Sequence, residues 1–113
     1  MGHTSAKVTL RSPDLSKAEQ VTLLVDMDST YTWVSNIALE RLGIKVRTVR
    51  KFKTVDGRLL ERKIGEVVIE YLDERATRIV VFAERGDAEV LGVDALEGLE
   101  LEVDPVTKLN VST

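Results

Sequence analysis

The stretch LLVDMDSTYTW, residues Leu23–Trp33, decides which fold we expect for this chain. It begins with an apolar segment typical of a buried strand and runs directly into Asp26 and Asp28, which are followed by Ser29. These residue types suit three uses. They could form a phosphoryl-transfer site with a metal ion, half of an acid–base pair of carboxylates, or a turn whose aspartates only accept hydrogen bonds from backbone N–H groups. The rest of the sequence is needed to distinguish them.

The composition indicates a small globular domain without a nucleic-acid partner. We expect all 113 residues, 1–113, to form a single domain, and the 43% hydrophobic content is enough for a modest core. Charged residues make up 31% of the chain, but the formal net charge is only -3, whereas binding to phosphate backbones requires a basic excess. The basic cluster at residues 47–53 is interrupted by Thr48, Val49 and Phe52, and a solvated strand or loop explains it.

Several classes of protein are excluded by what the sequence lacks. It has no cysteine, so disulfides, thiolate catalysis and cysteine-bound zinc are ruled out. Its single histidine, His3, lies in the N-terminal tail, where it is poorly placed for a Ser–His–Asp site. No apolar run approaches the ~18 residues that a membrane span needs, and no signal peptide is recognisable. We therefore expect a cytoplasmic protein with no membrane partner, no metal and no cofactor.

Strand and turn patterns recur along the chain. Alternation places Ala6, Val8 and Leu10 on one face of a first strand, and a loop is expected over residues 12–20. The clearest hairpin lies at residues 52–71, where Asp56–Gly57 is a strong tight-turn signal between β-rich arms. Gly65 interrupts the second arm, and we expect a β-bulge there.

Two short helices are predicted. The first spans residues 35–43, with Ser35 as the N-cap, Ile37, Ala38 and Leu42 on one face and Gly43 just past the C-terminus. In the second, Asp94 is the expected N-cap, since Glu97 follows at the spacing of a capping box.

The sequence as a whole predicts a mainly β domain. We expect about seven strands and two short helices with no long crossover helix, which is typical of a small barrel or sandwich. The order of apolar strand, loop and short helix occurs twice, at residues 21–43 and 79–99, and this suggests a weak internal repeat.

Taken alone, the segment VDMDST is similar to the first motif of the haloacid-dehalogenase-type phosphatases. In that family the first aspartate attacks phosphorus and the second is the acid/base, close to Mg²⁺. Those enzymes resemble doubly wound α/β proteins, are much longer, and need a distant lysine and a further acidic pair. Asp87 and Asp94 stand at the wrong spacing for that pair. A Mg-dependent phosphatase using Asp26 and Asp28 is therefore a remote alternative.

The chain over nearly its full length resembles the retropepsin-like aspartic proteases, in particular the small single-domain forms of archaea and bacteria. VDMDST stands at the Asp-Thr-Gly-Ala/Ser position, and it is followed in order by YTWVSNIALERLGI, the flap-like TVDGR, GEVVIEY and VLGVDALEGLELEVDP. The order and spacing of these segments carry the resemblance. It implies one domain that forms a small closed barrel of the acid-protease type with one or two short helices.

The resemblance also implies roles for individual residues. Asp26 matches the catalytic aspartate, and Ser29 matches the small residue that can hydrogen-bond its carboxylate. Leu91 and Gly92 match a step that packs behind the catalytic loop. The hairpin tip that closes over a bound peptide is matched by Thr54, Val55, Asp56, Gly57 and Arg58.

Because each chain supplies one catalytic aspartate, the resemblance implies a C2 homodimer that cleaves a peptide or protein substrate. Two Asp26 carboxylates would share one proton and activate a water between them. By contrast, Tyr31 and Trp33 are expected to pack in the core or in the dimer interface, and not to contact substrate.

Met27 and Asp28 stand where the family has Thr and Gly. The family's Thr hydrogen-bonds across the dimer beneath the aspartate pair, and Met27 cannot do so. Asp28 adds a second carboxylate to the substrate-binding region of each subunit. It would raise the pKa of the pair, turn toward solvent or Arg58, or help four carboxylates to bind a divalent cation. We expect an aspartic endopeptidase weakened at residues 27–28; the alternative is a non-catalytic peptide-binding or dimerisation module.

Overall fold

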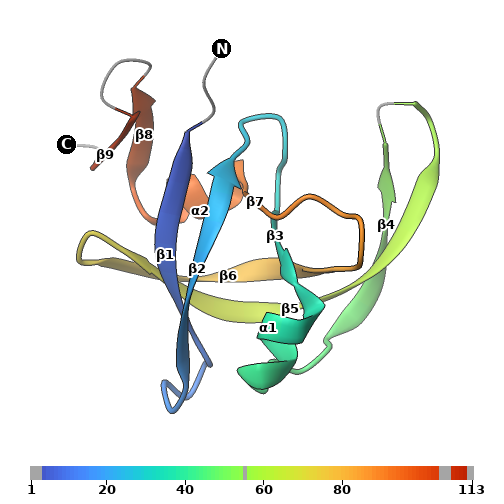
Figure 1. The fold of residues 1–113 in the computed structure, drawn as a ribbon, viewed down its shortest axis with the longest axis horizontal. Helices are drawn as coiled ribbons and strands as arrows, with labels where there is room; N and C mark the ends of the chain where they lie inside the picture. Colours follow the sequence, from blue (N-terminus) through green and yellow to red (C-terminus); the bar gives the residue numbers. More distant parts are fainter. Residues whose placement is uncertain (1–3, 55, 105–107, 112–113) are drawn as a thin grey trace.

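The computed structural model describes residues 4–54, 56–104 and 108–111, and of residues 102–104 and 108–111 it describes the backbone alone. These residues form nine strands and two short helices (Figure 1). In chain order they are β1 (Ser5–Arg11), β2 (Ala18–Val25), β3 (Thr32–Ser35), α1 (Asn36–Arg41), β4 (Thr48–Lys53), β5 (Leu59–Tyr71), β6 (Glu74–Ala83), β7 (Val90–Leu91), α2 (Val93–Gly98), β8 (Leu101–Asp104) and β9 (Lys108–Val111). The prediction of a mainly β chain with two short helices is confirmed.

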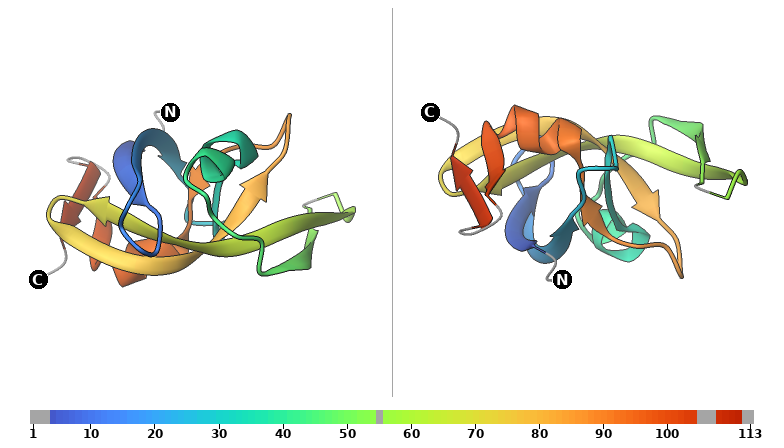
Figure 2. Two further views of the ribbon diagram at one scale, coloured as in Figure 1. Left: turned by 90° about the horizontal axis from the view of Figure 1, so that it is seen from below. Right: turned by 90° about the horizontal axis from the view of Figure 1, so that it is seen from above.

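Most strands belong to one sheet whose pairing returns to its starting point. The order is β1-β2-β7-β3-β6-β5-β4, and β1 also pairs with β5, so six strands follow one another in a ring and β4 extends from β5. The hairpin of β4 and β5 therefore reaches away from the body of the molecule, as both views of Figure 2 show. β8 and β9 form a separate antiparallel pair at the opposite end.

The weak repeat in the sequence corresponds to a repeat in the structure. β2, a loop, β3 and α1 are followed later by β6, a loop, β7 and α2. The two halves exchange partners, since β2 pairs with β7 and β3 pairs with β6, both in parallel. The loop at residues 26–31 and the loop at residues 84–89 consequently occupy equivalent positions.

The core lies inside this ring and is built almost entirely from aliphatic side chains. The predicted inner face of β1 is confirmed, because Ala6, Val8 and Leu10 are at most 2% exposed. Each fully buried Val or Leu stabilises the fold by about 1.5–3 kcal/mol relative to exposure. Residues from β2, β3, β5, β6, β7, α1 and α2 also belong to the core, among them Leu23, Val34, Val67, Ile69, Val80, Phe82, Leu91, Leu39 and Leu96.

The loop after β1 is shorter than the predicted span of residues 12–20, because β2 already begins at Ala18. Side chains close this tight connection: the Asp14 carboxylate accepts a 3.0 Å hydrogen bond from the Ser16 amide, and the Ser12 hydroxyl accepts one of 3.0 Å from the Lys17 amide. The Ser16 amide and hydroxyl hold the pKa of Asp14 at about 2.

The caps of α1 are as predicted, and so are two of the three residues expected to share a face, since Ala38 and Leu42 are 4% and 3% exposed. The Ser35 hydroxyl accepts a hydrogen bond from the Ile37 amide, and Gly43 follows the helix with a φ of 71°. Ile37, however, is 60% exposed, and Leu39 is fully buried in its place. The helix has only six residues and packs against β3 and β6 with Ala38 and Leu39 buried, so Ile37 in its first turn lies outside that contact.

Two further local predictions are wrong. The register of β5 against β6 is continuous through Gly65, so this glycine does not mark a bulge within the described strands. It is needed for close packing instead, since a Cβ there would lie 2.6 Å from the Lys45 carbonyl oxygen. In α2 the N-cap is Gly92 and not Asp94, which lies in the first turn.

A separate observation concerns membrane spans. Neither helix in the described part of the chain is long and apolar enough to cross a membrane.

Candidate functional site

Asp26 directly follows β2 and begins a tight turn. Its amide donates to the Leu91 carbonyl at 3.0 Å, and its own carbonyl accepts from the Ser29 amide at 3.2 Å. One carboxylate oxygen, Oδ1, accepts a 2.9 Å hydrogen bond from the Asp28 amide. The Asp26 carboxylate is thus held in an Asx-type turn at the end of β2, with its side chain partly exposed.

The segment formed by β7 and the start of α2 packs directly behind this turn. The Val93 and Asp94 amides donate to the carbonyls of Ser29 and Thr30 at 2.8 and 2.9 Å. The Gly92 amide donates to the buried Thr32 hydroxyl at 3.0 Å. These bonds place the backbone of Gly92 so close to the Asp26 turn that a Cβ would lie 2.3 Å from the Tyr31 carbonyl oxygen. Close packing is what the sequence led us to expect of Gly92.

Asp26 lines a cleft of about 510 Å³. One wall is the turn at residues 26–31, a second is the loop at residues 84–89, and the hairpin of β4 and β5 forms a third. In Figure 1 the turn after β2 and the tip of this hairpin lie at the same end of the molecule. The lining residues are Asp26, Asp28, Ser29, Thr30, Tyr31, Trp33, Phe52, Lys53, Thr54, Leu60, Gly86, Asp87, Ala88 and Val90.

Three aromatic side chains line this cleft, which the sequence did not predict. Phe52 on β4 packs edge-on against Tyr31, with ring centroids 6.3 Å apart, and at a tilt against Trp33 at 5.0 Å. All three are partly exposed. The i, i+2 spacing of Tyr31 and Trp33 was the available signal, because extended backbone places residues so spaced on the same side of the chain.

Asp28 and Ser29 both line the cleft, but their polar groups lie differently from what the resemblance implies. Asp28 is exposed, which matches the outcome in which its carboxylate turns toward solvent. The Ser29 hydroxyl donates to the Tyr31 carbonyl at 2.7 Å, and the carboxylate of Asp26 is bonded by the Asp28 amide instead. Met27, between Asp26 and Asp28, is 57% exposed.

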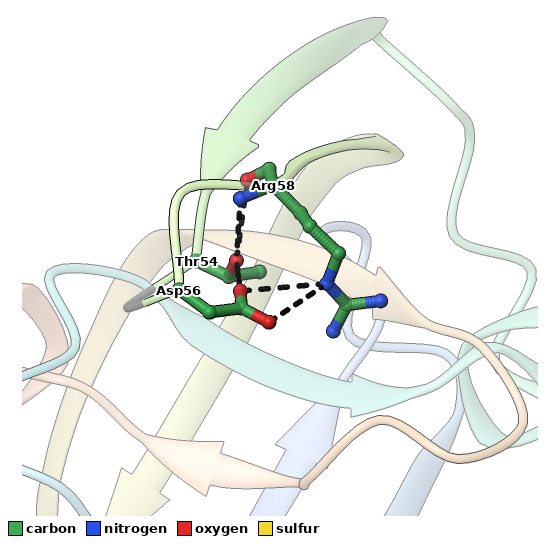
Figure 3. A network of polar contacts seen from close by, with 3 residues as sticks. All are labelled: Thr54, Asp56 and Arg58. Carbon is green, nitrogen blue, oxygen red and sulfur yellow. Dashed lines mark hydrogen bonds and ion pairs between the residues drawn. The ribbon is translucent and has the colours of Figure 1, made fainter.

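The predicted hairpin tip is confirmed as a turn, and a polar network orders it (Figure 3). The Thr54 hydroxyl donates to the Asp56 carboxylate and accepts a 3.0 Å hydrogen bond from the Arg58 amide. Arg58 Nε lies 3.1 Å from Asp56, so Arg58 pairs within the tip and not with Asp28. The hydrogen bond from Thr54 lowers the pKa of Asp56. Gly57 has a φ of 88°, which glycine adopts without strain.

Of the five predicted tip residues, Thr54 lines the cleft. Val55 lies outside the described residues. Asp56, Gly57 and Arg58 are exposed and belong to the turn itself, beyond the lining of the cleft in this conformation.

The loop at residues 84–89 is attached to the hairpin by an ion pair that the sequence did not predict. Arg62 Nε and Nη2 donate to the two carboxylate oxygens of Asp87 at 2.7 and 3.0 Å. The two side chains are 14% and 13% exposed. The Arg62 guanidinium lowers the pKa of Asp87, whose carboxylate also accepts a 2.8 Å hydrogen bond from the Glu84 amide.

Among the described residues no group of three or more His, Cys, Asp or Glu side chains converges as a metal site would require. Comparison of the chain with known protein families and with curated proteins yields no match.

Proposed function

We propose that this chain is one subunit of a homodimeric aspartic endopeptidase of the retropepsin-like type, with Asp26 as its catalytic residue. The observation that carries the proposal is the position of Asp26: its turn is clamped by the β7–α2 segment and opens into a 510 Å³ cleft beneath a hairpin. A cleft of this size suits the side chains of an extended peptide. The closed ring of six strands is consistent with the small-barrel form of this fold.

In this mechanism the two Asp26 carboxylates of a dimer share one proton. Two negative charges a few ångströms apart cannot both form without a large cost, so one carboxyl keeps its proton while the other is ionised. The ionised group activates a water for attack on the peptide carbonyl, and the protonated group donates to the carbonyl oxygen. The Asp28 amide, 2.9 Å from the Asp26 carboxylate, orients that carboxylate.

The surface around the turn favours association with a second copy. Leu24 and Met27 flank Asp26, and they are 44% and 57% exposed. Burying such apolar side chains stabilises a complex by up to about 1.5–3 kcal/mol each. A twofold axis beside this turn would bring the second Asp26 to the first and remove both side chains from water.

A second candidate function, a non-catalytic peptide-binding module of the same fold, is favoured by residues 27–29. Asp28 would bring two further carboxylates to the dimer axis, where they would disturb the shared proton. The Ser29 hydroxyl is bonded to the Tyr31 carbonyl at 2.7 Å and not to the Asp26 carboxylate within the described structure. Both features would weaken catalysis and leave the cleft able to bind a peptide.

The test is an assay of peptide cleavage with unstructured peptides across acidic to neutral pH, with and without a statine-type inhibitor. The endopeptidase proposal predicts inhibitor-sensitive cleavage that Asp26→Asn abolishes. Peptide binding without cleavage would support the binding module. Hydrolysis of a phosphate ester that requires Mg²⁺ and Asp26 would overturn both and establish the phosphatase alternative.

A further inference from the structure

Two arginines face each other across the base of the hairpin. Arg50 on β4 and Arg62 on β5 are direct cross-strand partners. Both are partly buried, whereas the residues on either side of them, among them Lys51 and Glu61, are exposed. Both side chains therefore lie on the covered face of the hairpin. Like charges directly opposite each other destabilise an antiparallel pair, so each arginine needs a compensating interaction.

Arg50 finds its partner on the turn that carries Asp26. Its Nη1 donates a 2.6 Å hydrogen bond to the Tyr31 hydroxyl, and its guanidinium carbon lies 5.2 Å from the centre of the Tyr31 ring. Phe52, two residues along the same strand, packs edge-on against the same ring. β4 is thus attached to the first wall of the cleft.

Arg62 finds its partner on the opposite wall. Its fork binds both carboxylate oxygens of Asp87 at 2.7 and 3.0 Å, and its Nη1 lies 3.6 Å from Glu84. The same Asp87 carboxylate accepts from the Glu84 amide, so the pair also holds the loop in shape. A bidentate, largely buried pair of this kind is geometrically specific in a way that a surface ion pair is not.

The two attachments are equivalent in the internal repeat. Tyr31 ends the loop between β2 and β3, and Asp87 lies in the corresponding loop between β6 and β7. Because Arg50 and Arg62 are paired across the two strands, they attach the hairpin to both loops along one line, at the same distance from its tip. The hairpin residues that line the cleft all lie between this line and the tip. They are Phe52, Lys53, Thr54 and Leu60.

We propose that Arg50 and Arg62 are positioning residues that fix the base of the hairpin to both walls and so set the width of the cleft. Motion of the hairpin that admits a peptide is then confined, among the described residues, to residues 51–54 and 56–61, and Arg50 and Arg62 mark its hinge. The hinge is a property of the free protein. Its effect on peptide turnover rests on the proposed function.

Trp33 provides a direct test, because it is the only tryptophan of the chain and lines the cleft. Arg62→Met keeps an unbranched apolar stem at this position but removes the guanidinium with its charge and its donors. We expect Arg62→Met to increase acrylamide quenching of Trp33 fluorescence several-fold. We also expect hydrogen exchange at the Glu84 amide to become about a hundredfold faster, since a largely buried pair is broken. For Arg62→Lys, which keeps the positive charge without the bidentate guanidinium, both Trp33 quenching and exchange at Glu84 should lie between those of the parent and those of Arg62→Met.

Matched controls separate this effect from general destabilisation. Arg41→Met removes an exposed ion pair with Glu19 far from the cleft and should change neither Trp33 quenching nor exchange at Glu84. Asp87→Asn breaks the same pair as Arg62→Met from the other side and leaves no stranded carboxylate. It should reproduce both effects, and it serves if Arg62→Met does not fold.

The parent protein tests the hinge itself. Amides hydrogen-bonded between β4 and β5 should exchange quickly within residues 51–53 and 59–61, and slowly at Arg50 and Arg62 and on the side of them away from the tip. Uniform exchange along the hairpin, or unchanged Trp33 quenching in folded Arg62→Met and Asp87→Asn, would overturn the proposal. If the protein cleaves peptides, Arg62→Met should raise KM more than it lowers kcat. If it cleaves none, the fluorescence and exchange results still decide the hinge, so its failure is distinguishable from failure of the proposed function.

Discussion

Replacing Gly92 with alanine should damage the Asp26 turn from behind. The added Cβ would lie 2.3 Å from the Tyr31 carbonyl oxygen and 2.8 Å from that of Ser29. Both contacts are with backbone, so no flexible side chain can move aside, and either the Asp26 turn or α2 must shift. The φ of Gly92 is -91°, which alanine adopts freely, so any cost is steric.

The magnitude follows from the packing and from the bonds at risk. Overpacking a close contact costs about 1–3 kcal/mol. A shift of α2 also weakens the hydrogen bonds that Val93 and Asp94 donate to the turn, at about 1 kcal/mol each. We therefore expect a loss of about 3–5 kcal/mol in the free energy of unfolding, out of the ~5–15 kcal/mol that a domain of this kind has. At about 4 °C per kcal/mol, Tm should fall by about 12–20 °C.

Urea denaturation followed by Trp33 fluorescence measures this loss. Gly57→Ala is the matched control, because its Cβ would meet no atom of the described structure within 4 Å while its φ of 88° makes alanine strained. That control should cost only about 1–2 kcal/mol. If Gly92→Ala lost no more than Gly57→Ala, close packing behind the Asp26 turn would not be what requires glycine at this position.

Three further predictions concern assembly, pH and the hairpin. Sedimentation equilibrium at micromolar concentration should give a mass near twice 12.6 kDa, and Met27→Glu should shift the protein toward monomer; a clean monomer in the parent would exclude a shared pair of Asp26 carboxylates. The Arg62 guanidinium holds the pKa of Asp87 below its ordinary 3.8, so the stability that this ion pair contributes should be present above pH 3.8 and lost as pH falls through the folded-state pKa. In urea denaturation from neutral to acidic pH, the free energy of unfolding of Asp87→Asn should therefore fall less steeply at acidic pH than that of the parent, and an equally steep fall would contradict this. Hydrogen exchange should be fast over residues 54–59 and slow over residues 21–25 and 79–82, and slow exchange at the tip would argue against a lid.

The parts of the fold that the sequence predicted correctly depend on local chemistry. Ser35 caps α1 through an amide two residues away, and Asp56–Gly57 forms its turn with hydrogen bonds that span four residues or fewer. The inner face of β1 follows from simple alternation. Such features need no knowledge of what packs against them.

The features that the sequence did not predict depend on contacts between distant segments. The cleft walls meet through Arg62 and Asp87, which are 25 positions apart, and through Arg50 and Tyr31, which are 19 apart. Neither pair has a sequence motif, because its geometry depends on the register of β4 against β5 and on the two parallel pairings of the ring. The predicted burial of Ile37 is wrong for the same reason, since the face that α1 buries is set by the sheet and not by the helix.

The central claim is that Asp26 belongs to an aspartic protease site, altered at residues 27–28. It is tested most directly by cleavage of an unstructured peptide across acidic to neutral pH with the double variant Met27→Thr, Asp28→Gly. Because small misplacements of catalytic groups cost about a hundredfold in rate, we predict a gain of about that size over the parent and a sharper pH profile. Asp26→Asn on that background should abolish cleavage. Cleavage no faster than the parent at any pH, or cleavage that survives Asp26→Asn, would contradict the claim.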